Sequence, residues 1–168
     1  MIFGFLDIVT GLGMGLSIFG ALVKVGTLQK SLFLIGALLM SIAPLVNRHR
    51  FFIALEIVVV LGTAVAFLPF SVFVKALFPL AAGALALIWL LKHNELESSH
   101  SKIGAFGILM LALGYAVSHA AIYLVGGFVL AIYAFQEAKS GYRLAYYWSA
   151  LNGFFVITAG VGVWRLFN

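Results

Sequence analysis

Residues 103–135 read IGAFGILMLALGYAVSHAAIYLVGGFVLAIYAF, an apolar run of 33 residues without a strong polar break. As a single helix rising 1.5 Å per residue, the run would be about 50 Å long. The hydrocarbon core of a bilayer is only about 30 Å thick. The run must therefore turn back on itself, and we expect the turn near Ser118 and His119. It predicts two membrane-spanning helices, at residues 103–118 and 120–135.

The rest of the chain has the same character. Of its 168 residues, 64% are hydrophobic and 9% are charged, whereas about 25% are charged in a soluble domain. This composition excludes a soluble enzyme, a nucleic-acid-binding module and a disordered tail, and it indicates an integral membrane protein surrounded by lipid bilayer. Polar breaks delimit five more apolar runs, at residues 5–25, 31–46, 51–68, 72–91 and 144–167. The predicted fold class is an all-α, polytopic bundle of seven transmembrane helices.

The Lys and Arg residues predict the orientation of this bundle. With seven spans, six of them share a side with the N-terminus, namely Arg48, Arg50, Lys92, Lys102, Lys139 and Arg143. The other side holds four, namely Lys24, Lys30, Lys75 and Arg165. Because cytoplasmic loops carry the excess of Lys and Arg, we expect a cytoplasmic N-terminus. The first residues lack the basic segment of a cleavable signal peptide, so the first span should be retained in a bacterial inner membrane.

An internal repeat relates the two halves of the chain. Residues 34–39 (LIGALL) correspond to residues 124–129 (LVGGFV) at an offset of 90. In the preceding spans, Gly13 and Gly20 correspond to Gly107 and Gly114 at an offset of 94. The pattern predicts a three-helix repeat in residues 1–69, a linker helix in residues 70–92 and a second three-helix repeat in residues 102–168. Because one helix separates the repeats, both would face the same way in the membrane.

Two segments of the last span extend this plan. Residues 150–155 (ALNGFF) look like an Asn-x-x-Gly-type segment, and residues 162–165 (GVWR) look like a Gly-x-x-Trp-Lys/Arg ending. In layout and in these segments, the chain resembles the superfamily of SWEET sugar transporters, PnuC-type vitamin transporters and YgjV-type bacterial inner membrane proteins. Residues 21–24 and 115–118 lack the Pro-Gln pair that ends the first helix of each SWEET half. The resemblance therefore favours a PnuC-like or YgjV-like relative over a sugar transporter.

Polar residues within the apolar runs are the candidate functional residues, because an ionisable group at a helix centre costs at least about 2.5–3.5 kcal/mol. Glu56 lies within residues 53–60 (IALEIVVV). It is predicted either to contact a solute or proton on the bundle axis, or to lie near the interface and pair with Arg48 or Arg50. Asn152 would lie about 13 Å along its helix, where it contacts a solute or forms an interhelical hydrogen bond.

Aromatic residues at the start of the last span complete the predicted solute site. We expect Trp148 and Tyr147 near one mouth of the pathway, beside the solute contacts of Asn152 and Glu56. Trp148 and Trp164 are 16 residues apart, or about 24 Å along a helix, which matches two interfacial aromatic belts.

Two further features of the spans have structural as well as functional interpretations. Lys75 is expected near the interface opposite Glu56, with its ammonium group snorkelling toward water. Gly11 and Gly15 form a small-xxx-small pair. This pair predicts close packing within the chain or a homo-oligomer contact.

No sequence pattern indicates an enzyme, a metal site or a cofactor. The chain has no cysteine, and its four histidines form no HxxxH or HExxH arrangement. A Gly-rich phosphate loop, a Ser/His/Asp group and paired carboxylates are also absent from the sequence.

The pattern instead favours a small transporter that passes a small, neutral polar solute by alternating access. The alternative is a non-transporting subunit or scaffold of a larger membrane complex. A cavity at mid-membrane that touches Asn152 would favour the transporter.

Overall fold

A computed structural model describes residues 2–23, 26–117 and 120–167. In these ranges the chain forms seven helices and no strand: α1 (Ile2–Leu22), α2 (Thr27–Asn47), α3 (Arg50–Val65), α4 (Val72–Lys92), α5 (Ser99–Val117), α6 (Ala120–Lys139) and α7 (Ala145–Phe167). Each predicted span is thus a helix whose ends differ by a few residues from the prediction. The turn expected at Ser118 and His119 lies outside the described residues, between the end of α5 and the start of α6.

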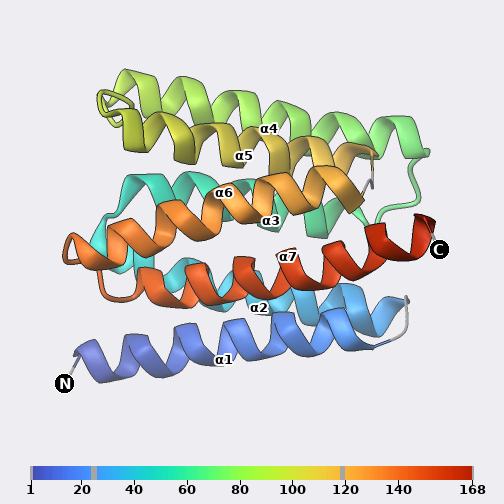
Figure 1. The fold of residues 1–168 in the computed structure, drawn as a ribbon, viewed down its shortest axis with the longest axis horizontal. Coiled ribbons are helices and arrows are strands. Elements are labelled where there is room, and N and C mark those ends of the chain that lie inside the picture. The colour runs from blue at the N-terminus through green and yellow to red at the C-terminus, as the bar shows by residue number, and fades with distance from the viewer. Residues whose placement is uncertain (1, 24–25, 118–119, 168) are drawn as a thin grey trace.

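The helices run alternately in opposite directions and form one bundle (Figure 1). Neighbours in sequence pack together, and additional contacts join α3 to α5 and α1 to α7. These contacts form a closed circuit through α1, α2, α3, α5, α6 and α7. Helix α4 lies outside the circuit and packs against α3 and α5.

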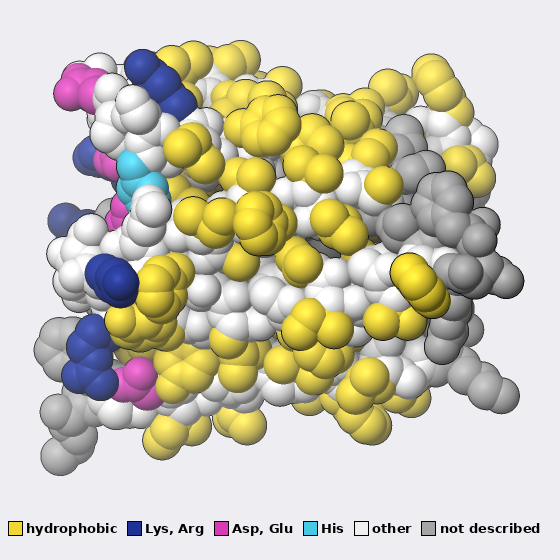
Figure 2. All heavy atoms as spheres, viewed as in Figure 1, with side chains coloured by type: hydrophobic (Ala, Val, Ile, Leu, Met, Phe, Trp, Pro, Cys, Tyr) yellow, Lys and Arg dark blue, Asp and Glu magenta, His cyan; other side chains and the backbone are white. Residues whose placement is uncertain are grey.

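The two ends of the bundle differ in composition. The start of α1 and the connections α2–α3, α4–α5 and α6–α7 lie at one end, which we call the charged end. Figure 2 shows Lys, Arg, Asp, Glu and His side chains gathered there, with hydrophobic side chains along the body of the bundle. The other end, which we call the pocket end, holds the connections α1–α2 and α3–α4 (Figure 1).

Among the residues that the structure describes, four helices, α1, α2, α4 and α6, are long and apolar enough to cross a membrane. Helix α3 has 16 residues, which is shorter than the roughly 20 residues of a usual span. Large apolar side chains are exposed along the bundle, among them Ile8, Leu12, Leu85, Ile88 and Phe128. Water would solvate these side chains poorly and lipid would cover them. The fold is therefore consistent with an integral membrane protein.

Glycines bring α1 close to α2 and α5 close to α6. A Cβ atom added at Gly13 would lie 2.7 Å from the carbonyl oxygen of Gly36 and 2.8 Å from the side chain of Met40. In the second pair of helices, a Cβ added at Gly107 would lie 2.8 Å from the side chain of Leu130. Only a residue without a side chain fits at such contacts.

A second pair of glycine contacts has the same arrangement. A Cβ added at Gly20 would lie 3.4 Å from the ring of Phe33, and one at Gly114 would lie 3.0 Å from the ring of Tyr123. The glycines are offset by 94 residues and their aromatic partners by 90. The helix faces that meet in α1 and α2 are therefore the ones that correspond in sequence to those meeting in α5 and α6.

Candidate functional site

The polar centre of the bundle is a bond between α3 and α7. Glu56 is only 4% exposed, and its Oε1 accepts a hydrogen bond of 2.6 Å from Nε1 of Trp148. Its Oε2 is also buried and has no hydrogen-bond donor among the described residues. Asn152, which is 7% exposed, donates from Nδ2 to the backbone carbonyl of Trp148 at 2.8 Å. The structure thus brings three of the four predicted solute contacts together.

These three side chains line a small cavity of about 50 Å³. Its walls come from α1, α2, α3, α5 and α7, so the cavity lies inside the circuit of helices. A cavity of this size holds a few water molecules, whereas pockets for small molecules usually measure about 300–1,000 Å³. The cavity is therefore small and mostly apolar, with Glu56 and Asn152 among its few polar lining residues.

The fourth predicted contact, Tyr147, lies elsewhere. A Cβ added at Gly11 would lie 3.4 Å from the Tyr147 ring, so this tyrosine packs between α7 and α1. It does not line the central cavity. Of the predicted glycine pair, Gly11 thus faces α7 of the same chain, while Gly15 is exposed with no atom near its Cβ position. A homo-oligomer through this pair stays a prediction.

Trp148 does not occupy the interfacial belt expected from its position in the sequence. It is 1% exposed, and its ring packs 4.7 Å from that of Phe52. The bond to Glu56 satisfies its N–H group within the bundle, which removes the need for contact with interfacial water. Trp164 is 69% exposed, as a belt residue would be.

Arg50 does not pair with Glu56, although that pairing was one interpretation of the sequence. Its Nη1 donates instead to Oε1 of Glu95 at 3.0 Å, in the connection between α4 and α5. The carboxyl group of Glu56 points inward to Trp148.

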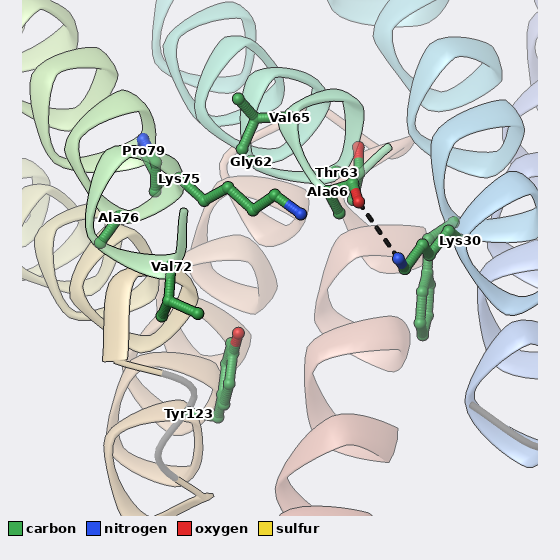
Figure 3. A pocket seen from close by; sticks show the side chains of 11 residues that line it. Lys30, Gly62, Thr63, Val65, Ala66, Val72, Lys75, Ala76, Pro79 and Tyr123 are labelled. Carbon is green, nitrogen blue, oxygen red and sulfur yellow. Dashed lines mark hydrogen bonds between the residues drawn. The ribbon is translucent and has the colours of Figure 1, made fainter. Parts of the chain in front are cut away.

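A second, larger cavity of about 330 Å³ lies at the pocket end (Figure 3). Lys30, Lys75 and Tyr123 extend into it from α2, α4 and α6. Phe33 and Thr63 line both this end pocket and the central cavity. The end pocket therefore leads toward the central cavity, with these two side chains between them.

A cluster of histidine and glutamate closes the charged end. Oε2 of Glu137, on α6, lies 3.2 Å from Nε2 of His49, and its Oε1 lies 3.1 Å from Nε2 of His100. The His49 ring stacks on Tyr142 with centroids 4.4 Å apart, and the His100 ring stacks on Tyr133 at 4.5 Å. The two histidines thus hold one carboxylate between the α2–α3 connection and the start of α5.

An aromatic layer separates this cluster from the central cavity. Phe51 packs against Tyr133 with ring centroids 3.9 Å apart, and Phe52 packs against both Tyr133 and Trp148. Phe51, Phe52 and Trp148 are among the largest fully buried side chains. A pocket of about 340 Å³ at the charged end, lined by Asp7, Asn47 and Tyr142 among others, shares no described lining residue with the central cavity, whereas the end pocket shares two.

Sequence reasoning did not predict this cluster or the end pocket. No local sequence pattern links His49 or His100 to Glu137, which lies 88 residues beyond His49. Lys75, expected near the interface, lies at the pocket end and lines the end pocket with Lys30. For the end pocket, the sequence contains one indication: neither Lys30 nor Lys75 has a carboxylate near it in the chain.

Together, the helices form an α-helical bundle with a buried polar centre, and its long apolar helices are consistent with an integral membrane protein. In the described part of the chain, no group of three or more His, Asp or Glu side chains could hold a metal ion, the cluster of His49, His100 and Glu137 included. Comparisons with known protein families, curated proteins and solved structures find no match to this chain.

Proposed function

We propose that this protein is a small membrane transporter that moves a small polar solute by alternating access. All seven helices would cross the membrane, and the solute would contact Glu56 and Asn152 in the central cavity. The observation that carries the proposal is this cavity, because it places an unpartnered carboxylate oxygen and an amide inside a helix circuit. Polar groups at membrane depth usually mark a solute or ion pathway.

The difference between the two ends supports alternating access. The end pocket shares Phe33 and Thr63 with the central cavity, whereas the aromatic layer lies between that cavity and the histidine–glutamate cluster, and the pocket at the charged end shares none of the cavity's described lining residues. A transporter at rest has one side open and the other closed. The cavity of about 50 Å³ would have to widen to accept a solute, and separation of the two bundles would widen it.

The glycine contacts support two like-facing bundles, made of helices α1–α3 and α5–α7. Corresponding faces meet in α1 with α2 and in α5 with α6, and corresponding helices run in the same direction (Figure 1). The two contacts that join the bundles are α3 with α5 and α7 with α1. They also correspond, because the proposed repeat pairs α3 with α7 and α5 with α1. The Glu56–Trp148 bond crosses from one bundle to the other at the centre.

The distribution of Lys and Arg supports a cytoplasmic charged end. Of the ten Lys and Arg residues, six belong to segments on the same side as the N-terminus and four to segments on the other side. Cytoplasmic loops usually carry the excess of Lys and Arg. We therefore place the N-terminus in the cytoplasm and the end pocket on the outer face of a bacterial inner membrane.

A binding screen tests the proposal directly. The protein in neutral detergent is heated with sugars, nucleosides and vitamins, since a ligand that binds the native state raises Tm by mass action. We expect at least one compound to raise Tm in the unaltered protein and in Gln136→Ala, which removes an exposed amide at the charged end. Asn152→Ala should lose the shift.

Two outcomes contradict the proposal. One is a screen in which no compound raises Tm, and the other is a compound whose effect survives both Asn152→Ala and Glu56→Gln. Either result would instead favour a non-transporting subunit, for which the polar centre is purely structural.

A further inference from the structure

The end pocket has a basic lining that the proposed transport pathway does not explain. Lys30 and Lys75 approach from opposite walls, and Figure 3 shows their ammonium groups directed toward one another across the pocket. The carboxylates of the sequence all lie away from it: Asp7, Glu95, Glu97 and Glu137 belong to the charged end, and Glu56 lines the central cavity. Two lysines therefore share a cavity whose described lining residues include no carboxylate.

The hydrogen bonds of the lysines leave room for a ligand. Nζ of Lys30 donates to the backbone carbonyl of Ala66 at 3.1 Å, which uses one of its three donors. The described residues offer Lys75 no side-chain hydrogen bond or ion pair. A snorkelling lysine would extend outward to water, whereas the Lys75 side chain is half-buried and extends across the pocket (Figure 3).

The helix directions add to the positive potential in this pocket. Lys30 is the fourth residue of α2, and Lys75 is the fourth residue of α4. Both helices begin at the pocket end (Figure 1), so the positive ends of their dipoles lie near the two ammonium groups. Like charges in such an arrangement repel one another, and an anion between them would remove the repulsion.

We propose that the end pocket binds a phosphate or carboxylate group between the ammonium groups of Lys30 and Lys75. The volume of about 330 Å³ lies within the range of small-molecule sites. The Tyr123 ring, which also points into the pocket (Figure 3), forms a further wall. This site stands on its own residues and does not depend on transport through the central cavity.

The anionic group has two possible sources, a soluble anion or the headgroup of an anionic lipid. Both present oxygen atoms that accept charge-assisted hydrogen bonds from ammonium groups. The test therefore uses inorganic phosphate and citrate as soluble probes, and short-chain phosphatidylglycerol as the lipid probe. Phosphatidylcholine of the same chain length serves as the neutral lipid.

The experiment measures Tm of the full chain in neutral detergent, with ionic strength held constant by sodium chloride. Each probe is titrated against the unaltered protein, Lys75→Gln, Lys30→Gln and Lys102→Gln. The last variant removes an exposed charge at the charged end and is the matched control. Lys75→Arg restores the charge and guards against a folding defect in Lys75→Gln.

We expect at least one anionic probe to raise Tm in the unaltered protein, in Lys102→Gln and in Lys75→Arg. Lys75→Gln and Lys30→Gln should each weaken binding about tenfold or more, as the loss of one charge-assisted hydrogen bond predicts. A shift by phosphate or citrate identifies a soluble anion, and a shift by phosphatidylglycerol alone identifies a headgroup. The proposal is overturned if no anionic probe exceeds chloride or phosphatidylcholine, or if Lys75→Gln and Lys30→Gln bind as tightly as Lys102→Gln.

Discussion

At the scale of single residues, the Glu56–Trp148 bond is the interaction on which the centre of the bundle depends. It joins residues that are 92 positions apart, and both side chains are buried. A buried polar group that loses its partner costs about 1–3 kcal/mol, because it was taken out of water without compensation. The bond therefore links the stability of the chain to the geometry of the proposed solute site.

Replacement of Trp148 by Phe removes the N–H donor and keeps one aromatic ring, although it also leaves a small void where the second ring of the buried indole lay. Oε1 of Glu56 then loses its partner, and Oε2 already has none in the described part of the chain. We expect the free energy of unfolding to fall by about 1–3 kcal/mol, measured by denaturation in mixed micelles.

Glu56→Gln is the matched control for this change, because an amide oxygen still accepts from Nε1 of Trp148. It should lose less stability than Trp148→Phe. Equal loss in both variants, or no loss in Trp148→Phe, would show that the bond contributes little.

At the scale of helices, the contacts depend on small residues rather than on complementary charges. Helices α1 and α2 approach at Gly13 and Gly36, and α5 and α6 approach at Gly107 and Gly126. In a lipid environment, close backbone packing takes the place of a hydrophobic driving force between helices. These positions fix the distance between neighbouring helices in each pair.

Gly13→Ala tests the close contact between α1 and α2. Gly15→Ala is the control, because Gly15 lies two residues further along the same helix. A Cβ at Gly13 would lie 2.7 Å from a backbone oxygen of α2, whereas one at Gly15 would have no atom within 4 Å. We expect Gly13→Ala to lose about 1–3 kcal/mol through overpacking.

Gly15→Ala should be neutral or slightly stabilising, because alanine favours a helix over glycine by about 1 kcal/mol. Chemical denaturation of both variants measures the difference. If the two behave alike, α1 and α2 adjust freely and the close contact is not structurally important.

At the scale of the whole molecule, the connections between the two proposed bundles differ from one end to the other. At the charged end, the His49–Glu137 bond links the first bundle to the second, whereas the His100–Glu137 bond lies within the second. Only the first of these bonds has to break for the bundles to separate at the charged end. The two histidines therefore form a matched pair for a test of gating.

Thiol labelling can report that gating, because the sequence contains no cysteine. Thr63→Cys places one thiol at the boundary of the end pocket and the central cavity. In right-side-out vesicles, a membrane-impermeant reagent reaches the pocket end, and we expect it to label this thiol. In inverted vesicles the reagent reaches only the charged end, and we expect no labelling. Adding His49→Phe should allow labelling in inverted vesicles, since it removes the bond that joins the two bundles at the charged end.

His100→Phe should not have this effect, because it removes a bond within one bundle. Equal labelling of the two double variants in inverted vesicles would argue against the His49–Glu137 bond as the closing contact. Labelling confined to inverted vesicles before any histidine is changed would reverse the proposed orientation.

Local sequence patterns predict much of the fold. They also predict about half of the candidate site, namely Glu56 and Asn152. The unbroken run at residues 103–135 required a turn, and α5 and α6 lie on either side of it. Glu56 and Asn152 were identified because polar groups in apolar helices need partners, and both line the central cavity. Tyr147 and Trp148 were both assigned to a mouth, because position along a helix predicts depth but not the direction in which a side chain points.

The sequence by itself determined the helices of this protein and their apolar character, because both depend on the polarity of residues that are neighbours in the chain. The tertiary structure alone decided which helix faces meet. It turned Trp148 inward to Glu56, placed Glu137 between two histidines and directed Lys30 and Lys75 into one pocket. Such pairings depend on how all the helices pack around one another, and no short stretch of sequence specifies that arrangement.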